Sequence, residues 1–398
     1  MVYDIVVIGA GIVGLASSLK LLEKNPSLKL LIIEKEDSIA KHQTGNNSGV
    51  IHSGIYYKPG SLKAQNCVRG YKMLLDFCEK NNVEHKICGK VIVAVLPEEI
   101  PYMEKLLERG KENSLTGLRR LSREEVKEIE PHVECSAGIL VPQTGIIDYK
   151  EVAKKYLEII QNYGGQIQFN QTITGIKIKS DYCEVSTENG SFESKFVVTC
   201  SGLHSDRIAK MTHPDLPIRI IPFRGEYYKI KKEKRHFVKS LIYPVPDPSF
   251  PFLGVHFTRM IDGEVEAGPN AVLAFKREGY SKTSFSVRDT IETFLWKGFH
   301  QVVKKNWKTG LGEYYRSLNK SAFVKELQKM IPEIHSDDLE KGGAGVRAQA
   351  CSKDGGLLDD FYIVEDKRIF HVCNAPSPAA TSSLSIGDYI SEKVLARL

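Results

Sequence analysis

The hydrophobic and polar positions of this chain predict two kinds of element in different places. Apolar residues recur at helical spacing over residues 61–80, 98–113, 149–163, 286–307, 314–330 and 381–397. Alternating or β-branched runs, which predict strands, lie at 90–95, 172–178, 183–187, 195–200, 218–230, 252–257 and 264–275. Because the strands cluster in the middle of the chain, we expect a largely antiparallel sheet there, beside a separate parallel α/β region.

The N-terminal apolar strand leads directly into glycines at a characteristic spacing. Residues 4–8 read DIVVI, and GAGIVG follows with Gly9, Gly11 and Gly14. The first glycine permits a tight turn, the second lets backbone approach a pyrophosphate, and the third lets the next helix pack on the strand. A second apolar strand ends at Glu34, whose carboxylate would accept hydrogen bonds from ribose hydroxyls and repel a 2′-phosphate. The order of these features predicts a dinucleotide site for NAD or FAD rather than NADP.

Two later segments repeat the sequence of strand, small-residue loop and helix. They are KFVVTCSGLHSDRIAK at 195–210 and RIFHVCNAPSPAATSSLSIGDYISEKVL at 368–395. We expect both to return to the dinucleotide-binding domain, since ligands bind at the carboxyl ends of its strands. The second loop would aim helix N–H groups at a partly anionic group, such as the N1 and O2 region of a reduced flavin. A nicotinamide site rarely needs such a return, so the pattern favours FAD.

Composition narrows the class of protein only a little. With 398 residues, 42% of them hydrophobic and 26% charged, the chain is long enough for two globular domains. A net charge of +6 suits acidic small molecules or a membrane surface as readily as nucleic acid. The eight cysteines include no C-x-x-C pair, which predicts reduced thiols in a cytoplasmic protein. The eleven histidines are dispersed, and no cluster has metal-ligand spacing, so we expect no metal.

Membrane contact is expected to be peripheral at most. The N-terminal apolar run carries Asp4 where a signal peptide has basic residues, and no later run is long enough to span a bilayer. Segment 293–310 is either an interfacial docking helix on the inner membrane or a helix wedged between domains. Its helical projection groups Phe294, Leu295, Phe299, Val302 and Val303 on one face, and Trp296, His300 and Trp307 on another. The basic run 229–239 has no aromatic platform, so we expect a solvated hairpin and no nucleic-acid partner.

Several segments together resemble a known family over nearly the whole chain. They are DIVVIGAGIVGLA, NNSGVIHSGIYYKPGSLKA, GIIDY, RGEYY, GVHFTRMIDGEVEAGPNAVLA, GAGVRAQA with DDFYI, and NAPSPAATSSLSIG. The chain resembles the D-amino-acid-oxidase-like flavoproteins and, among them, the L-2-hydroxyglutarate dehydrogenases and oxidases. The resemblance implies an α/β fold with a discontinuous FAD-binding Rossmann-like domain at 1–86, 146–216 and 340–398. An antiparallel-sheet substrate domain of the glycine-oxidase type would occupy 87–145 and 217–339.

The resemblance implies oxidation of L-2-hydroxyglutarate to 2-oxoglutarate by hydride transfer to non-covalently bound FAD. Electrons would pass to a quinone-linked acceptor or to oxygen. An amine or imino-acid oxidase of the glycine or sarcosine oxidase type is the alternative enzyme on this fold, and a non-catalytic FAD-binding module is a further alternative. Some amine-oxidising relatives tether flavin through a cysteine near Cys351, but we expect a packed small residue here. The implied cofactor contacts are Gly9, Gly11, Gly14, Glu34, Lys35, Thr44, Asn46, Asn47, Ser48, Ile173, Ser201, Gly202, Gly345, Ser377, Ala379, Ala380 and Thr381.

Oxidation of a 2-hydroxy dicarboxylic acid requires a base for the hydroxyl proton and cations for the carboxylates. His52, in the segment that would pass beside the flavin, and His256, on a predicted strand, are rival bases, and the sequence does not separate them. Each candidate arginine stands among apolar or glycine residues, where an unpaired charge is costly. The candidate substrate contacts are Arg224, Arg259, Arg347, Tyr57 and Tyr243.

Overall fold

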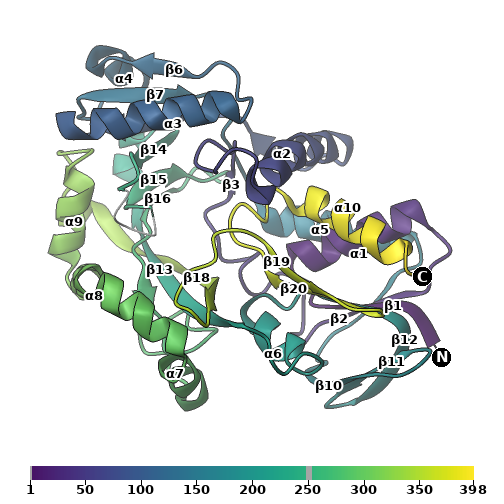
Figure 1. Ribbon diagram of the computed structural model, residues 1–398. Coiled ribbons are helices and arrows are strands. Elements are labelled where there is room, and N and C mark those ends of the chain that lie inside the picture. The colour runs from purple at the N-terminus through teal and green to yellow at the C-terminus, as the bar shows by residue number, and fades with distance from the viewer. Residues whose placement is uncertain (1, 248–252) are drawn as a thin grey trace.

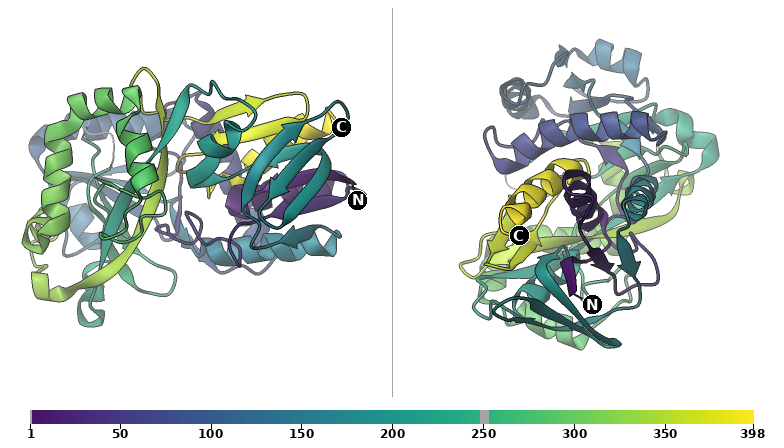
Figure 2. Two further views of the ribbon diagram at one scale, coloured as in Figure 1. Left: turned by 90° about the horizontal axis from the view of Figure 1, so that it is seen from below. Right: turned by 90° about the vertical axis from the view of Figure 1, so that its right-hand side faces the viewer.

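Two large β-sheets lie side by side in the computed structural model, which describes residues 2–247 and 253–398 (Figure 1). The eight-stranded sheet and its helices carry both ends of the chain, and the nine-stranded sheet forms the other half of the molecule. Seen from below, the two halves occupy opposite ends (Figure 2). A three-stranded sheet has the order β3–β8–β4, with β3 at Val50–Ile51, β8 at Gly145–Ile147 and β4 at His85–Lys86.

The eight-stranded sheet is parallel at its centre. β1 (Val2–Ile8) pairs in parallel with β2 (Leu30–Ile33) on one side and with β12 (Gly190–Thr199) on the other. β9 continues the parallel arrangement beyond β2, while β20 pairs in parallel with the end of β12. The predicted returns of segments 195–210 and 368–395 are therefore confirmed. The remaining pairs, β10 with β11, β11 with β12 and β19 with β20, are antiparallel. The bounds are β9 (Gln166–Gln168), β10 (Ile173–Ile178), β11 (Cys183–Thr187), β19 (Tyr362–Glu365) and β20 (Ile369–Asn374).

Helices cover one face of this sheet and bury its largest apolar cluster. They are α1 (Ile12–Lys24), α2 (Leu62–Lys80), α5 (Tyr149–Asn162) and α10 (Ser383–Leu395). A Cβ atom on Gly387 of α10 would lie 2.6 Å from the Ala16 carbonyl oxygen of α1, so glycine is what allows these two helices to pack so closely. The short α6 (Ser205–Ala209) follows β12.

The nine-stranded sheet is antiparallel except where β14 pairs with β5. Its long strands β13 and β18 pair along nearly their whole length and reach from this sheet toward the eight-stranded half. The bounds are β5 (Lys90–Ala94), β6 (Arg119–Leu121), β7 (Ala137–Val141), β13 (Ile218–Ile230), β14 (Leu241–Pro244), β15 (His256–Arg259), β16 (Val265–Gly268), β17 (Val272–Leu273) and β18 (Leu339–Ser352).

Both faces of this sheet are covered around β5. Val91 and Val93 belong to one apolar cluster together with residues of α4 (Arg123–Ile129) and α9 (Lys320–Gln328). Ile92 and Ala94 belong to a second cluster together with α3 (Ile100–Glu112). Successive side chains of a strand point to opposite faces, so burial on both sides explains the uninterrupted apolar run of β5.

The predicted helices near the end of the substrate region have different boundaries in the structure. Segment 286–307 contains two helices, α7 (Val287–Phe294) and α8 (Lys297–Leu318), and α8 continues through the predicted break near residue 310. The break comes at Asn319, whose side chain caps α9 by accepting a hydrogen bond from the Ala322 N–H. The predicted strand 252–257 begins outside the described residues. Short 3₁₀ helices lie at Pro97–Glu99, Gly202–His204, Lys232–Phe237 and Ser336–Asp338.

None of the helices in the described ranges has the length and apolar character needed to cross a bilayer.

Candidate active site

A cavity of about 1000 Å³ connects the two halves of the molecule. Its walls include Gly9 and Glu34 from the first βαβ unit and, at the other end, Tyr243, His256 and Arg347 from the nine-stranded sheet. Small-molecule sites span roughly 300–1,000 Å³, so this cavity suits a large ligand together with a small one.

The glycine loop at one end is shaped by close backbone contacts. Gly9 has a φ of +106°, and a Cβ atom there would lie 2.5 Å from the Cys200 carbonyl oxygen. A Cβ atom on Gly14 would lie 2.0 Å from the Gly9 carbonyl oxygen, so Gly14 serves helix–strand packing and does not line the cavity. Glu34 Oε2 accepts a hydrogen bond of 2.7 Å from the Ala10 N–H. Glu34 therefore shapes the loop as well as lining the cavity.

The loop after β2 is held by its own side chains. Thr44 Oγ1 accepts a 3.0 Å hydrogen bond from the Ile12 N–H at the start of α1. The Asn46 amide donates to the carbonyls of Lys41 and His42, and the Asn47 amide donates to the Thr44 carbonyl. The two asparagine side chains thus fix the loop while their residues line the cavity.

Most predicted cofactor contacts come together along this cavity. Gly14 and Thr381 do not line it. The Thr381 hydroxyl instead lies 2.8 Å from the Tyr149 hydroxyl and accepts a hydrogen bond from the His52 N–H, which fixes the segment after β3. The residues that line it are Gly9, Gly11, Glu34, Lys35, Thr44, Asn46, Asn47, Ser48, Ile173, Ser201, Gly202, Gly345, Ser377, Ala379 and Ala380.

Unpartnered polar atoms along the cavity fit a large polar ligand such as FAD. Four buried atoms on lining residues have no hydrogen-bond partner among the described residues: His42 Nδ1, Tyr56 Oη, Ser201 Oγ and Asn374 Oδ1. Buried polar groups are normally hydrogen-bonded, so these orphan atoms mark positions for ligand contacts. The glycine loop at Gly9 and the length of the cavity also fit FAD.

His256 is held at the substrate end in a defined orientation. Its ring stacks on the Tyr243 ring, with 3.9 Å between centroids, and its Nδ1 lies 2.8 Å from the Gly254 carbonyl oxygen. Because a carbonyl only accepts, Nδ1 carries the proton and Nε2 keeps a lone pair. Burial, with the positive charges of Arg347 and Lys90, lowers the pKa of His256 to about 3. The imidazole is neutral near pH 7 and can accept a proton.

His52 lies in the same cavity on a segment fixed by its backbone. Its N–H donates to Thr381 Oγ1, and the Cys67 thiol donates to its carbonyl oxygen at 3.4 Å. Nε2 lies 3.5 Å from Ser377 Oγ. Burial lowers the pKa of His52 to about 3, and the charge of Lys90 acts in the same direction. Both candidate bases are therefore neutral imidazoles.

The three predicted arginines have different surroundings. Arg347 on β18 pairs with Phe223 on β13, so the two side chains share a face of the sheet, and Arg347 lines the cavity. The neighbouring Arg224 points to the other face, because successive side chains alternate. There it forms an ion pair with Glu226 at 2.9 Å and does not line the cavity.

Arg259 is also absent from the cavity wall. Its Nη1 donates a 2.8 Å hydrogen bond to the Val238 carbonyl oxygen. The structure thus brings Arg347, Tyr57 and Tyr243 to the cavity, but neither Arg224 nor Arg259.

Two lysines at this end were missed by sequence reasoning. Lys90 is 1% exposed and lies behind the rings of Tyr56 and Tyr243, while Lys63 pairs with Asp359 at 2.8 Å. The sequence did carry a signal for Lys90, since this lysine begins the apolar run KVIVA. Lys63 carried no comparable signal, because it begins an ordinary amphipathic helix.

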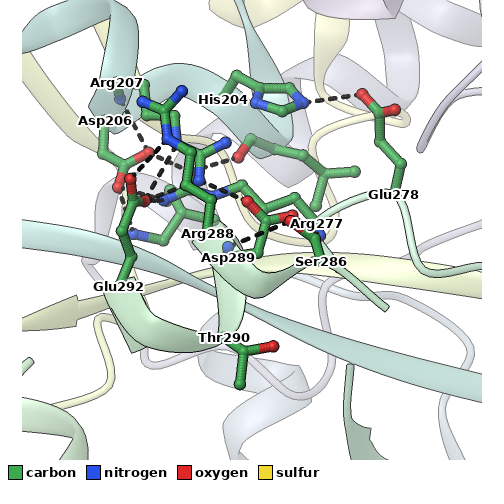
Figure 3. Close-up of polar contacts among 12 residues, drawn as sticks. His204, Asp206, Arg207, Arg277, Glu278, Ser286, Arg288, Asp289, Thr290 and Glu292 are labelled. Carbon is green, nitrogen blue, oxygen red and sulfur yellow. Dashed lines mark hydrogen bonds and ion pairs between the residues drawn. The ribbon is translucent and has the colours of Figure 1, made fainter. Parts of the chain in front are cut away.

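At the other end, Glu278 connects the half built on the nine-stranded sheet to the loop after β2. It accepts a hydrogen bond from the His204 ring at 2.8 Å (Figure 3). It also pairs with Lys35, and these contacts hold its pKa far below the usual range. Potential ligand atoms of Glu36, His42 and Glu278 lie within 4.8 Å of one another. Lys35 already supplies a cation there, since its ammonium also pairs with Glu36 at 2.6 Å. The absence of a metal stays a prediction.

A buried ion-pair network holds α7 against α6 beside this end (Figure 3). Arg277 donates to both oxygens of Asp206, and its backbone N–H donates to Asp289 at 2.8 Å. Arg207 pairs with Asp289 and Glu292. The network fixes the loop that carries Ser201 and Gly202 relative to the half built on the nine-stranded sheet.

Known proteins match the chain along its whole length. Residues 4–393 match the family model described as FAD dependent oxidoreductase. The L-2-hydroxyglutarate dehydrogenase of Indibacter alkaliphilus is 55% identical over 398 residues, which is 100% of each chain. The mitochondrial L-2-hydroxyglutarate dehydrogenase of Homo sapiens is 46% identical, covering 99% of this chain and 89% of its own. The Escherichia coli K12 L-2-hydroxyglutarate dehydrogenase is 45% identical, covering 98% and 93%.

Solved structures share the fold. The dithionite-reduced L-alpha-glycerophosphate oxidase of Mycoplasma pneumoniae, with FAD bound, has a TM-score of 0.82 at 23% identity and covers 100% of this chain and 95% of its own. The glycine oxidase of Geobacillus kaustophilus has a TM-score of 0.75 at 14% identity and the same coverage. The predicted fold, an FAD-binding Rossmann-like part beside an antiparallel-sheet part, is confirmed. By its family match and its relatives, this chain belongs to the L-2-hydroxyglutarate dehydrogenases of the FAD-dependent oxidoreductase family.

Proposed function

We propose that the protein oxidises L-2-hydroxyglutarate to 2-oxoglutarate, with FAD in the cavity. The observation that carries this proposal is the continuity of one cavity from the glycine loop to Arg347, His52 and His256. FAD, when bound, would accept the hydride from C2 of the substrate. The relatives of 45–55% identity carry the same activity in their names.

The two neutral imidazoles would handle the hydroxyl proton. One of His52 and His256 accepts it, and the other orients the hydroxyl by a hydrogen bond. The contact between His256 Nδ1 and the Gly254 carbonyl leaves Nε2 available as an acceptor. Since burial holds both pKa values near 3, neither ring needs to lose a proton before the reaction at neutral pH.

Cationic side chains would bind the two carboxylates. Arg347 lines the cavity and can present a guanidinium to a carboxylate in a bidentate fashion. Tyr57 and Tyr243 also line the cavity and carry hydroxyl groups that can donate to a carboxylate. Arg224 and Arg259 are excluded from this role, since other groups of the protein hold them outside the cavity.

The same proposal divides the chain into an FAD-binding part at 1–86, 146–216 and 340–398 and a substrate-binding part at 87–145 and 217–339. β18 begins at the last of these boundaries and pairs with β13 in the nine-stranded sheet. The β13–β18 ribbon would therefore be shared by the two parts, with Gly345 and Arg347 on the cavity wall.

Anaerobic titration of the purified yellow protein tests the reaction. We expect L-2-hydroxyglutarate to bleach the flavin absorbance, and D-2-hydroxyglutarate, glycine and sarcosine to leave it unchanged. Bleaching by glycine or sarcosine alone would establish the amine-oxidase alternative. A flavin that no 2-hydroxy acid or amine reduces would support a non-catalytic FAD-binding module instead.

FAD would be held without a covalent bond. Cys351 is fully buried in an apolar cluster with Ile221, Phe299 and Val302, away from the cavity wall, and burial raises the pKa of its thiol to about 11. A thiol so placed is unreactive. Acid precipitation should therefore release all the flavin into the supernatant, and flavin retained in the protein pellet would contradict this assignment.

Electrons would leave to a quinone-linked acceptor at a membrane surface, with oxygen as the alternative. The apolar surface of α7 and α8 supports this part of the proposal. Val303, Trp307, Leu311 and Tyr315 recur every four residues along α8 and are 42–62% exposed. Phe299 and Val302, predicted on the same face as Leu295 and Val303, are instead buried. The exposed large apolar residues on and beside α7 and α8 are Phe285, Val287, Ile291, Phe294, Leu295, Val303, Trp307, Leu311, Tyr315 and Leu318.

Lysines beside this surface would favour an anionic bilayer, at the inner face of a cytoplasmic membrane. Lys297, Lys304, Lys305 and Lys308 are all exposed on α8. Apolar contacts combined with basic residues are typical of interfacial helices. We expect the holoenzyme to co-sediment with phosphatidylglycerol vesicles and not with phosphatidylcholine vesicles.

The double variant Trp307→Glu, Leu311→Glu should lose vesicle binding, and Leu96→Glu, an equally exposed apolar position on the substrate half, should keep it. Equal sedimentation of all three proteins would contradict docking through α8 and leave oxygen as the favoured acceptor.

A further inference from the structure

A buried lysine without an acidic partner lies behind the substrate end of the cavity. Lys90, the first residue of β5, is 1% exposed. No carboxylate in the described part of the chain forms an ion pair with it, and among the titratable groups there only the Cys67 thiol acts to raise its pKa. A buried ammonium is unfavourable unless a counter-charge compensates it.

Two aromatic rings separate this ammonium from the cavity. Lys90 Nζ lies 4.4 Å from the Tyr56 ring centroid and 4.8 Å from that of Tyr243. Both tyrosines line the cavity, and Tyr243 stacks on His256. Cation–π contacts are strongest when the cation is desolvated, as here, but they do not replace a missing anion. Lys90 thus fixes the two rings, and through Tyr243 the orientation of the imidazole.

The groups that face Lys90 are neutral around pH 7. The pKa of the Cys67 thiol on α2 is raised to about 12 by burial, and the pKa values of Tyr56 and Tyr243 are raised as well. His52, after β3, and His256, on β15, have pKa values of about 3 and carry no charge. Burial lowers the pKa of Lys90 to about 7. Lys90 is therefore the group of this set that titrates near neutral pH.

We propose that Lys90 is a positioning residue of the substrate site, which holds Tyr56 and Tyr243 in place and supplies behind them the positive charge that favours a dicarboxylate over a monocarboxylate. This inference rests on the proposed dicarboxylate substrate. The anion in the cavity then provides the counter-charge that the protein itself lacks, and its arrival stabilises the protonated amine. Binding at a pH above 7 must consequently take up a proton, whereas at pH 6 the amine already carries it.

Calorimetry of the wild-type holoenzyme tests this linkage without any variant. 2-Oxoglutarate, which oxidised flavin does not consume, is titrated at pH 8 in two buffers of different ionisation enthalpy. We expect uptake of roughly one proton per site at pH 8, and almost none at pH 6. Binding without proton uptake at pH 8 would overturn the proposal.

A variant series tests the selectivity. Lys90→Met keeps the length of the side chain and removes the charge, and Lys86→Met is the matched control at an exposed lysine. The ratio of kcat/KM for L-2-hydroxyglutarate to that for L-2-hydroxybutyrate should fall about tenfold in Lys90→Met and stay unchanged in Lys86→Met. Lys90→Met should also bind 2-oxoglutarate at pH 8 without proton uptake.

The two proposals fail in different ways. If L-2-hydroxyglutarate reduces the flavin but Lys90→Met retains the wild-type selectivity and proton uptake, Lys90 has no such role and the proposed function stands. If L-2-hydroxyglutarate does not reduce the flavin, the proposed function itself is lost. Should Lys90→Met not fold, the wild-type calorimetry decides alone.

Discussion

The glycine-loop end and the substrate end of the cavity are built from different kinds of contact. At the first, close backbone contacts shape the glycine loop: a Cβ atom on Gly9 would meet the Cys200 carbonyl oxygen, and one on Gly14 would meet the Gly9 carbonyl oxygen. At the second, His52, His256 and Arg347 arrive from three separate segments and are oriented by neighbouring side chains and strand register. The two glycine positions tolerate no added side-chain atom. The side chains at the substrate end can each be truncated without unfolding the protein, and each truncation removes part of the function.

The largest effect is expected at the glycine loop. Gly14→Val places atoms where a Cβ atom alone would be 2.0 Å from the Gly9 carbonyl oxygen, so α1 cannot pack on β1. We expect protein without flavin, measured as flavin absorbance per mole of protein. Gly310→Ala, in α8 with nothing within 4 Å of its Cβ, is the control and should keep full occupancy. Full flavin content in Gly14→Val would contradict the requirement for glycine at this position.

Loss of an imidazole should lower the rate and leave the flavin bound. Replacement of the base, His52→Asn or His256→Asn, should lower the rate constant of flavin reduction by about 10²–10⁴, and replacement of the orienting histidine should lower it less. Stopped-flow absorbance with saturating substrate measures both. Equal, small losses in the two variants would show that neither ring takes the proton.

Truncation of the cavity arginine should act mainly on substrate binding. Arg347→Ala is expected to raise KM by about 10²-fold, because it removes a charged partner of a carboxylate. Arg224→Ala should leave KM unchanged and lower the Tm, since it leaves the carboxylate of Glu226 without its guanidinium. The reverse result would mean that the face assigned to each arginine is wrong.

The pH dependence of kcat/KM tests the protonation state of the two histidines in the free enzyme. Both histidines have pKa values near 3, so kcat/KM should show no fall near pH 6.5 as the pH decreases from 8 to 5. Folding stability should behave differently. The unfolded chain binds protons at these histidines below about pH 6.5 and the folded chain does not, so stability falls as pH falls toward 3. A rate profile with an acid limb at 6.5 would indicate a solvated base.

The smallest effect is expected at the ion pairs of Glu278. Its folded-state pKa is depressed, so its contribution is present above the unfolded value near 4.5 and is lost as pH falls below it. Glu278→Gln should destabilise the protein by about 1 kcal/mol at pH 7, measured by urea unfolding. The difference from wild type should shrink at pH 4, and a difference that grows at pH 4 would contradict the pairing.

The sequence predicted well what depends on local spacing. The glycine fingerprint, the strand ending at Glu34 and the two later returns are all found as expected, because each is a contiguous run with its own turn chemistry. The dispersed site was predicted in part, with His52, His256 and Arg347 in one cavity.

What the sequence did not reveal depends on tertiary register. Arg224 and Arg347 both lie among apolar and glycine residues, and only the folded structure shows that Arg347 lines the cavity while Arg224 is paired with Glu226 outside it. Lys90 was missed because a lysine at the edge of an apolar run usually points to solvent, and here both faces of the sheet are covered. The end of α8 depended on a cap at Asn319 rather than on the glycines before it.

Single-turnover reduction of the holoenzyme by L-2-hydroxyglutarate carrying deuterium at C2 tests the central claim most directly. We expect complete anaerobic bleaching of the flavin, one 2-oxoglutarate per flavin, and a rate severalfold slower than with the unlabelled acid, because the C2–H bond breaks in that step. A flavin that stays oxidised in the presence of saturating L-2-hydroxyglutarate would contradict it.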